Sequence, residues 1–175
     1  MIKLQDYVIE KLHIGNYKKD KYHPKDKYKL KLLIDDLIKE RGENCDLNDI
    51  NVSDITDMTF LFEYSKFNGN ISEWNVDNVT SMACMFKESN FDGDISKWNV
   101  SNVKYMDHMF SESSFTGKNG DISSWDVSNV KNMEEMFWGC KNFCIKLDKW
   151  DVTNVKNIKN MFTYVQDKYR PNWYK

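Results

Sequence analysis

The sequence predicts an α/β solenoid, in which short similar units stack side by side around one elongated core. Three observations lead to this prediction. A pattern of about 25 residues recurs along most of the 175-residue chain, the apolar spacing changes within each copy, and most copies contain a glycine turn. A unit this short cannot close a core alone, whereas stacked copies bury one continuous apolar column.

The repeat is clearest in two consecutive units, residues 67–86 and 91–110, which share the order Phe, Gly, Ile, Trp, Val, Met, Met-Phe. A third unit covers residues 115–137 and a more divergent fourth covers residues 143–162. Their tryptophans, Trp74, Trp98, Trp125 and Trp150, are 24, 27 and 25 residues apart. Extra residues in 116–120 explain the longer gap. An incomplete leading copy, residues 46–62, lacks the tryptophan.

Each unit contains two apolar spacings. Trp98 and Val100 are two residues apart, which is the spacing of a strand with one buried face. The apolar residues of segment 103–110 recur at intervals of three and four, which is the spacing of a helical turn. Asp92-Gly93-Asp94 is typical of a turn. We therefore expect the units to contribute one short parallel sheet and a row of short helical segments.

The chain divides into three regions. Residues 1–45 are expected to form an N-terminal helical cap, 46–162 the repeats, and 163–175 a C-terminal cap or tail. The cap helix is predicted over residues 24–41, with Pro24 as its first residue and Gly42 as its stop. Its apolar stripe comprises Leu30, Leu33, Ile34 and Leu37. Residues 3–14 are expected to add a short helix or strand, and Tyr164, Tyr169, Trp173 and Tyr174 to close the far end.

These residues resemble a known family. The string from Phe91 to Val103, followed by Met106-x-x-Met109-Phe110, resembles the BspA-like leucine-rich repeats, including the mycoplasma-lipoprotein type. The resemblance covers residues 46–162, and residues 23–48 look like the helical cap of short, leaderless members. It implies a right-handed leucine-rich-repeat-like horseshoe that binds partners and has no enzymatic activity. The fourth repeat departs from the pattern, because Ile145-Lys146-Leu147 replaces Gly-Asp-Ile.

Charge is distributed unevenly along the chain. Residues 1–42 carry a net charge of +4, residues 43–165 carry −8, and the whole chain carries −2. An acidic repeat body argues against direct nucleic-acid binding and favours a basic protein surface as partner. The lysine-rich stretch 18–31 leaves contact with a phosphate backbone as an alternative, with a solvated surface as the simpler interpretation.

The sequence shows no catalytic or metal-binding constellation. The histidines, His13, His23 and His108, form no pair at metal-ligand spacing. The cysteines, Cys45, Cys84, Cys140 and Cys144, show neither a disulfide pattern nor a second ligand pair. The repeated Gly-Asp turns could cradle calcium, but repeated turn geometry explains them more simply. We therefore expect no enzyme activity, no metal and no cofactor.

The same features bear on location. The N-terminus lacks a signal-peptide core, and no run of about 18 apolar residues occurs. Reduced cysteines suit a cytoplasmic protein. The alternative is a secreted or cell-surface protein whose upstream leader has been removed.

Two surfaces are candidates for binding. The outward residues of the predicted strands form a polar, acid-leaning face comprising Glu73, Asn75, Asp77, Lys97, Asn99, Asp126, Lys149 and Asp151. The second candidate is the predicted helical ridge, where Tyr105, His108 and Trp138 interrupt the repeat, together with Tyr64 and Lys141. Exposed tryptophan and tyrosine are favoured interface anchors. Packing against a neighbouring loop is the alternative for Trp138.

Together these observations predict a non-catalytic protein-binding solenoid, an intracellular regulator or inhibitor encoded by a bacterium or phage. It would bind a protein, such as a nucleic-acid-processing enzyme, through its acidic repeat surface. The alternative is a cell-surface adhesin module that binds host or neighbouring-cell proteins.

Overall fold

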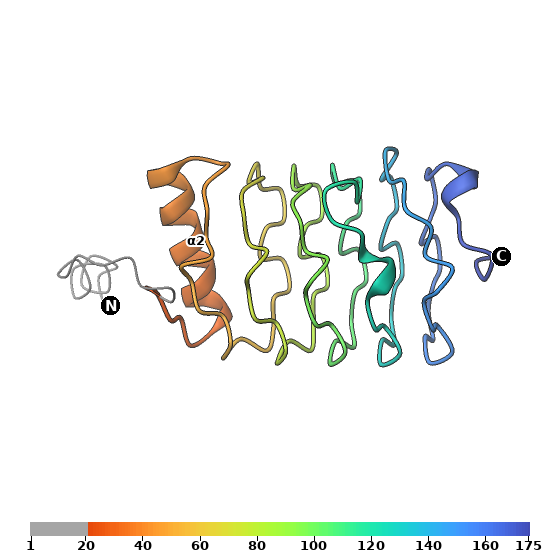
Figure 1. Ribbon diagram of the computed structural model, residues 1–175, viewed down its shortest axis with the longest axis horizontal. Helices are drawn as coiled ribbons and strands as arrows, with labels where there is room; N and C mark the ends of the chain where they lie inside the picture. The colour runs from red at the N-terminus through yellow and green to blue at the C-terminus, as the bar shows by residue number, and fades with distance from the viewer. Residues whose placement is uncertain (1–20) are drawn as a thin grey trace.

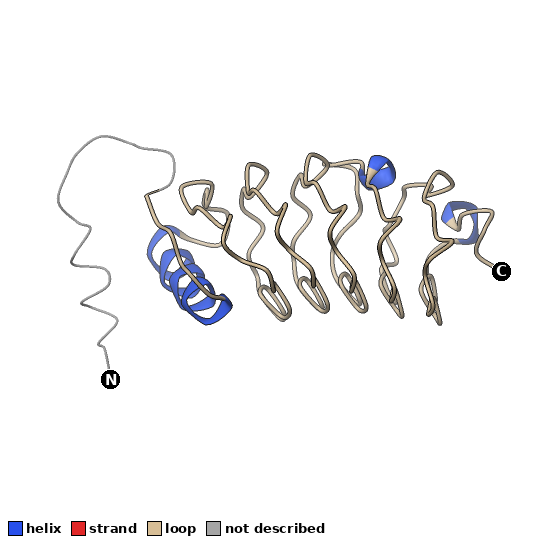
Figure 2. Ribbon diagram, turned by 90° about the horizontal axis from the view of Figure 1, so that it is seen from below, coloured by secondary structure: helices blue, strands red, loops and turns tan. Residues whose placement is uncertain are grey.

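The computed structural model of this chain describes residues 21–175. Within these residues there is one α-helix, α2 (Lys27–Arg41), followed by a single row of coils that runs to the C-terminus (Figure 1). The other helical pieces in the described residues are two 3-10 turns, η1 (Ile122–Ser124) and η2 (Asp167–Tyr169). The coils are otherwise irregular, as the tan trace of Figure 2 shows. The predicted element at residues 3–14 lies outside the described part of the chain.

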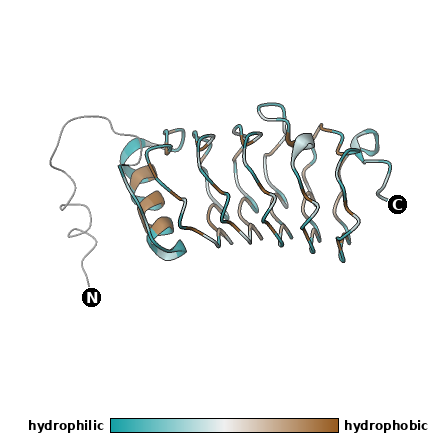
Figure 3. Ribbon diagram, turned by 60° about the horizontal axis from the view of Figure 1, so that its bottom comes forward, coloured by the Kyte–Doolittle hydropathy of each residue, from teal (hydrophilic) through white to brown (hydrophobic). Residues whose placement is uncertain are grey.

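Helix α2 covers the first coil. It begins after Asp26, whose carboxylate accepts the N–H of Lys29 at 2.9 Å, and it ends at Gly42, whose φ is +91°. The predicted start at Pro24 was therefore wrong, because the capping carboxylate of Asp26 determines where the helix begins. The predicted apolar stripe is confirmed and buried: Leu30, Leu33, Ile34 and Leu37. Figure 3 shows this hydrophobic band on α2 continuing into the coils.

The core consists of aromatic columns that run through successive coils. One column stacks Phe62, Phe86, Phe110, Phe137 and Phe162 at centroid distances of 5.4 to 5.6 Å. A tryptophan column runs beside it, and each indole N–H donates to a backbone carbonyl of the preceding coil. The members are Trp74, Trp98, Trp125, Trp150 and, half-buried at the C-terminus, Trp173. The predicted repeat core is therefore confirmed.

The predicted parallel sheet is absent from residues 21–175. The parallel pairings between neighbouring coils are isolated bridges, and one series of them joins Asp57, Ser81, Tyr105, Asn132 and Asn157. The predicted strand at Trp98 and Val100 is a run of turns, because Trp98 N–H donates to Ile95 and Val103 N–H donates to Val100. Trp98 and Val100 both face the core. Turns can place alternate side chains on one face as a strand does, so the spacing alone was misleading.

The predicted helical segments are runs of turns as well. We call residues 57–64, 81–88, 105–112, 132–139 and 157–164 the ladder segments. Alternate N–H groups in a ladder segment donate to the next coil: Met82 to Tyr105, Cys84 to Asp107, Phe86 to Met109 and Glu88 to Ser111, at 2.8 to 2.9 Å. The intervening N–H groups of Met85, Lys87 and Ser89 donate three residues back within their own coil. This pattern satisfies the backbone donors of residues 84–89 without an α-helix.

Positive φ angles make this geometry possible. Two residues of each ladder segment have φ between +53° and +73°. The first column comprises Phe60, Cys84, His108, Glu135 and Asn160, and the second comprises Tyr64, Glu88, Glu112, Gly139 and Tyr164. A side chain in this conformation costs roughly 1–2 kcal/mol, so the inter-coil hydrogen bonds and core stacking must offset it.

A glycine allows close approach between coils. A Cβ on Gly69 would lie 1.9 Å from the carbonyl oxygen of Cys45 in the preceding coil. In the fourth unit Ile145 replaces this glycine and fits against Gly117, where an added Cβ would lie 2.1 Å from the Ile145 Cδ1 atom. The departure of the fourth repeat is thus accommodated by the glycine of the coil before it.

Candidate protein-binding surface

Four residues of the predicted polar face have a structural role. Asn75, Asn99, Asp126 and Asp151 are exposed, and the side-chain oxygen of each accepts the N–H of the residue two positions later at 3.0 to 3.2 Å. Hydrogen bonds from Ser128 and Thr153 hold the pKa values of Asp126 and Asp151 below their usual range. These side chains close a turn in every coil. This structural role explains why they recur in the repeat, and no binding partner is needed to account for it.

The remaining members of that face, Glu73, Asp77, Lys97 and Lys149, are also exposed. Beside them is a column of asparagines that sequence reasoning missed: Asn78, Asn102, Asn129 and Asn154. Each donates its side-chain amide to a backbone carbonyl of the preceding coil at 2.7 to 2.8 Å. Its signal in the sequence is an asparagine at the same repeat position in all four units.

The second candidate surface is formed by the outward side chains of the ladder segments, which we call the ladder face. It brings together the other three predicted residues, Tyr105, His108 and Trp138. Tyr105 is 48% exposed. His108 is half-buried, with its Nδ1 atom 3.4 Å from the Glu135 carboxylate. Trp138 is half-buried too, and its ring packs edge-on against Tyr164 at 5.5 Å. Trp138 is therefore better described as packed against Tyr164 than as a free interface anchor.

Acidic side chains predominate on the ladder face. It carries seven carboxylates, those of residues 57, 63, 88, 107, 112, 134 and 135, against two lysines at 87 and 159. Asp57 pairs with Lys27 and Glu63 with Lys87. In contrast, Asp107, Glu112, Glu134 and Glu135 form no ion pair with a lysine or arginine of residues 21–175. We call these four residues the central acidic patch.

Exposed aromatic side chains also stand on the ladder face. Tyr64, Tyr105 and Tyr164 are 62%, 48% and 63% exposed, and Phe60 is 49% exposed. Sequence reasoning identified Tyr64 and Tyr105, but it assigned Tyr164 to a closing cap and missed Phe60. Helical spacing could not predict the outward position of Phe60 or Tyr164, because both residues lie in runs of turns and have positive φ.

Three of the four cysteines, Cys45, Cys84 and Cys140, are buried, and Cys144 is half-buried. Burial raises the pKa of Cys84 to about 11 and that of Cys140 to about 12, so both remain thiols at neutral pH. Cys140 donates to the Phe110 carbonyl at 2.7 Å. No group of three or more His, Cys, Asp or Glu side chains within residues 21–175 is arranged to hold a metal ion. No helix in that part of the chain is long and apolar enough to cross a membrane.

Comparison with known proteins identifies a family. A family model described as "Mycoplasma protein of unknown function, DUF285" matches twice, over residues 35–118 and 89–173. No curated protein and no solved structure matches the chain. The two matches overlap over the central coils, as expected when a model of stacked repeats fits the same chain in two registers. Since they jointly span residues 35–173, the chain belongs to the DUF285 family of mycoplasma proteins of unknown function.

Proposed function

We propose that this chain is a non-catalytic protein-binding solenoid whose partner docks on the ladder face. The observation that carries the proposal is the central acidic patch, because its four carboxylates have no lysine or arginine partner within residues 21–175 and share their ladder segments with exposed Tyr105 and half-buried Trp138. Tyrosine supplies contact area at low entropic cost, and carboxylates without a lysine or arginine partner favour a basic partner surface.

The rigidity of the ladder segments supports the same function. Alternate N–H groups of the first four ladder segments donate to the next coil, so the backbone that carries their outward side chains loses little conformational freedom on binding. The resemblance to BspA-like leucine-rich repeats agrees with a binding role. We also propose that the coils wind in the right-handed, leucine-rich-repeat-like sense that the resemblance implies.

The partner that this surface fits best is a protein with a basic groove, such as a nucleic-acid-processing enzyme, which the chain would inhibit or regulate. The four cysteines are free thiols, three of them buried, and this supports a reducing, cytoplasmic setting in a bacterium or phage-infected cell.

Charge reversal tests the proposal. The Glu112→Lys/Glu134→Lys variant should lose at least tenfold in affinity for a protein captured by the wild-type chain from lysate. The matched control, Glu73→Lys/Asp77→Lys, changes the same charge on the polar turn face and should keep that affinity. Raised salt should weaken wild-type binding, since the contact is electrostatic. If the two variants behave alike, or salt has no effect, the ladder face is not the binding surface.

A further inference from the structure

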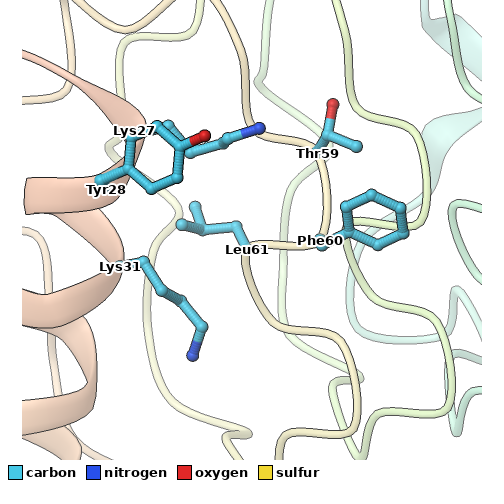
Figure 4. A pocket seen from close by; sticks show the side chains of 6 residues that line it. All are labelled: Lys27, Tyr28, Lys31, Thr59, Phe60 and Leu61. Carbon is cyan, nitrogen blue, oxygen red and sulfur yellow. The ribbon is translucent and has the colours of Figure 1, made fainter.

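Three exposed apolar side chains gather where α2 meets the first ladder segment. Tyr28 and Leu32 are one helical turn apart on α2 and are 76% and 50% exposed, and Phe60 of the first ladder segment is 49% exposed. A groove of about 440 Å³ lies between the two elements and is lined by Lys27, Tyr28, Lys31, Thr59, Phe60 and Leu61. Figure 4 shows Tyr28 on the helix side of the groove and Phe60 on the coil side. Large apolar side chains gathered at a groove are typical of a surface that another segment covers.

The charges at this groove are already balanced. The Lys27 ammonium pairs with the Asp57 carboxylate at 2.6 Å, and Lys31 pairs with Asp35 in the next turn of α2. Neither lysine therefore requires an anionic occupant. The feature that remains exposed is apolar surface, and an apolar, nearly neutral segment covers such a surface most favourably.

The first 14 residues of this chain have that chemistry. They contain eight apolar or aromatic side chains, and their two lysines are matched by one aspartate and one glutamate. Leu4, Val8 and Leu12 recur at intervals of four residues, which is the spacing of one side of a helix. The sequence of residues 1–14 thus offers an apolar stripe to match the exposed apolar side chains of α2.

The chain enters the first coil close enough for this segment to reach the groove. Tyr22 is fixed there, because its N–H donates to the Asp49 carbonyl at 3.1 Å. Tyr28 follows Tyr22 by six residues, so the two lie no more than about 20 Å apart. The ten residues from Leu12 to Tyr22 span up to about 33 Å. A tether of this length holds its segment at an effective concentration on the order of millimolar, which a free partner rarely reaches.

We propose that residues 1–14 dock on α2 and complete the N-terminal cap of the solenoid. The leucine and valine side chains at intervals of four cover Tyr28 and Leu32, and the segment closes the groove beside Phe60. The polar side chains between them face solvent. The central acidic patch belongs to later coils, so this docking leaves it free for the partner proposed above.

Limited proteolysis of the full chain tests the contact. Trypsin should cleave after Lys11 at least tenfold more slowly in the wild type than in Tyr28→Ala/Leu32→Ala, because docking protects the segment and alanine preserves the helix. Cleavage after Lys104 in the coils reports general unfolding and should be equal in the two proteins. The matched control is Tyr164→Ala, which removes a side chain that is 63% exposed at the other end of the row and should keep the wild-type rate at Lys11.

Photo-crosslinking identifies the occupant. Benzoylphenylalanine at position 28 of the full chain, in an equal mixture of isotope-labelled and unlabelled protein, should form adducts with residues 1–14 of the same copy. Leu4→Ser/Val8→Ser should lower the adduct yield at least fivefold. Lys3→Ser/Asp6→Ser, which changes two polar positions of the same segment, should leave the yield unchanged.

Several results overturn the proposal. These are equal cleavage after Lys11 in the wild type and in Tyr28→Ala/Leu32→Ala, adducts that join two copies, no adduct with residues 1–14, or a yield that Leu4→Ser/Val8→Ser does not change. If Tyr28→Ala/Leu32→Ala also accelerates cleavage after Lys104, the crosslinking pair decides alone, because its changes leave α2 and the coils intact.

Discussion

At the residue scale, the tryptophan column shows how one side chain serves both the core and the stacking of coils. Trp98 is 4% exposed, its ring stacks on Trp74 at 6.4 Å, and its indole N–H donates to the Ile71 carbonyl at 3.2 Å. Each tryptophan therefore ties two coils together by dispersion and by a directional bond. This double contact explains why tryptophan occupies the same position in all four units.

Replacing one indole measures this contribution. Trp98→Phe removes the inter-coil hydrogen bond and leaves a small cavity, so the free energy of unfolding should fall by about 2 kcal/mol. Trp138→Phe is the matched control. Trp138 is half-buried with no indole hydrogen bond to residues 21–175, and its substitution should cost less than about 0.5 kcal/mol. Urea unfolding measures both, and equal losses would remove the special role of the column.

At the element scale, the ladder segment is the feature that the sequence could not specify. The repeat located the core correctly, and every methionine from Met58 to Met161 is buried. The prediction of helical segments was wrong because apolar intervals of three and four residues suit a helix and a run of turns equally. Positive φ at Glu88 or Glu112 leaves no trace in the residue type, whereas Gly139 and Asn160 are residues that adopt this conformation readily.

Glycine substitution distinguishes the two conformations. In a helix, Glu88→Gly would destabilise by about 1 kcal/mol. At φ +54°, the same change should leave stability unchanged or raise it by up to about 1 kcal/mol, because glycine adopts this conformation without strain. Gly139→Ala is the converse, with φ +73° and a new Cβ 2.9 Å from the Glu112 Cγ atom, and should cost about 1 kcal/mol. Thermal unfolding of both variants provides the comparison.

The contact between α2 and the first coil should depend on pH. Burial alone would raise the pKa of Asp57, but hydrogen bonds from Lys27 and Thr59 outweigh it and hold that pKa below its usual value. A lowered folded-state pKa stabilises the protein above the unfolded-state value near 4, and this stability is lost as pH falls through the lowered pKa.

Lys27→Met should therefore destabilise the protein at pH 7, by no more than about 1 kcal/mol because the Asp57 side chain is 45% exposed. The difference from the wild type should disappear as the pH falls below about 4. Urea titrations at several pH values measure it. A difference that persists at low pH would mean that lost packing of the lysine stem, rather than the ion pair, is responsible.

At the scale of the whole molecule, the row of coils predicts that a destabilising substitution affects mainly its own coil and the adjacent coils. Each coil contacts its neighbours only, so stability is approximately a sum of coil and interface terms. The C-terminal residues continue the row, since Trp173 donates to the Leu147 carbonyl at 2.9 Å and lies beside Phe162 at 6.1 Å. The sequence indicated aromatic residues at this end, but it could not show that Trp173 takes the position of a fifth tryptophan.

Trp173→Ala should consequently loosen one end of the row. We expect amide hydrogen exchange to accelerate across residues 157–165, while residues 57–64 and α2 keep wild-type rates. The same experiment on Trp98→Phe is the control, because a central change should affect coils on both sides. If Trp173→Ala instead accelerated amide hydrogen exchange uniformly along the chain, the coils would unfold as a single cooperative unit.

The central claim is that ladder segments bond between coils and not within a helix. Trans-hydrogen-bond scalar couplings measured by NMR test it most directly, since each coupling joins one donor nitrogen to one acceptor carbonyl carbon. The structure predicts couplings from the amide of Cys84 to the carbonyl of Asp107, and from Phe86 to Met109. Couplings from Met109 or Phe110 to carbonyls four residues earlier would instead demonstrate an α-helix and contradict the account.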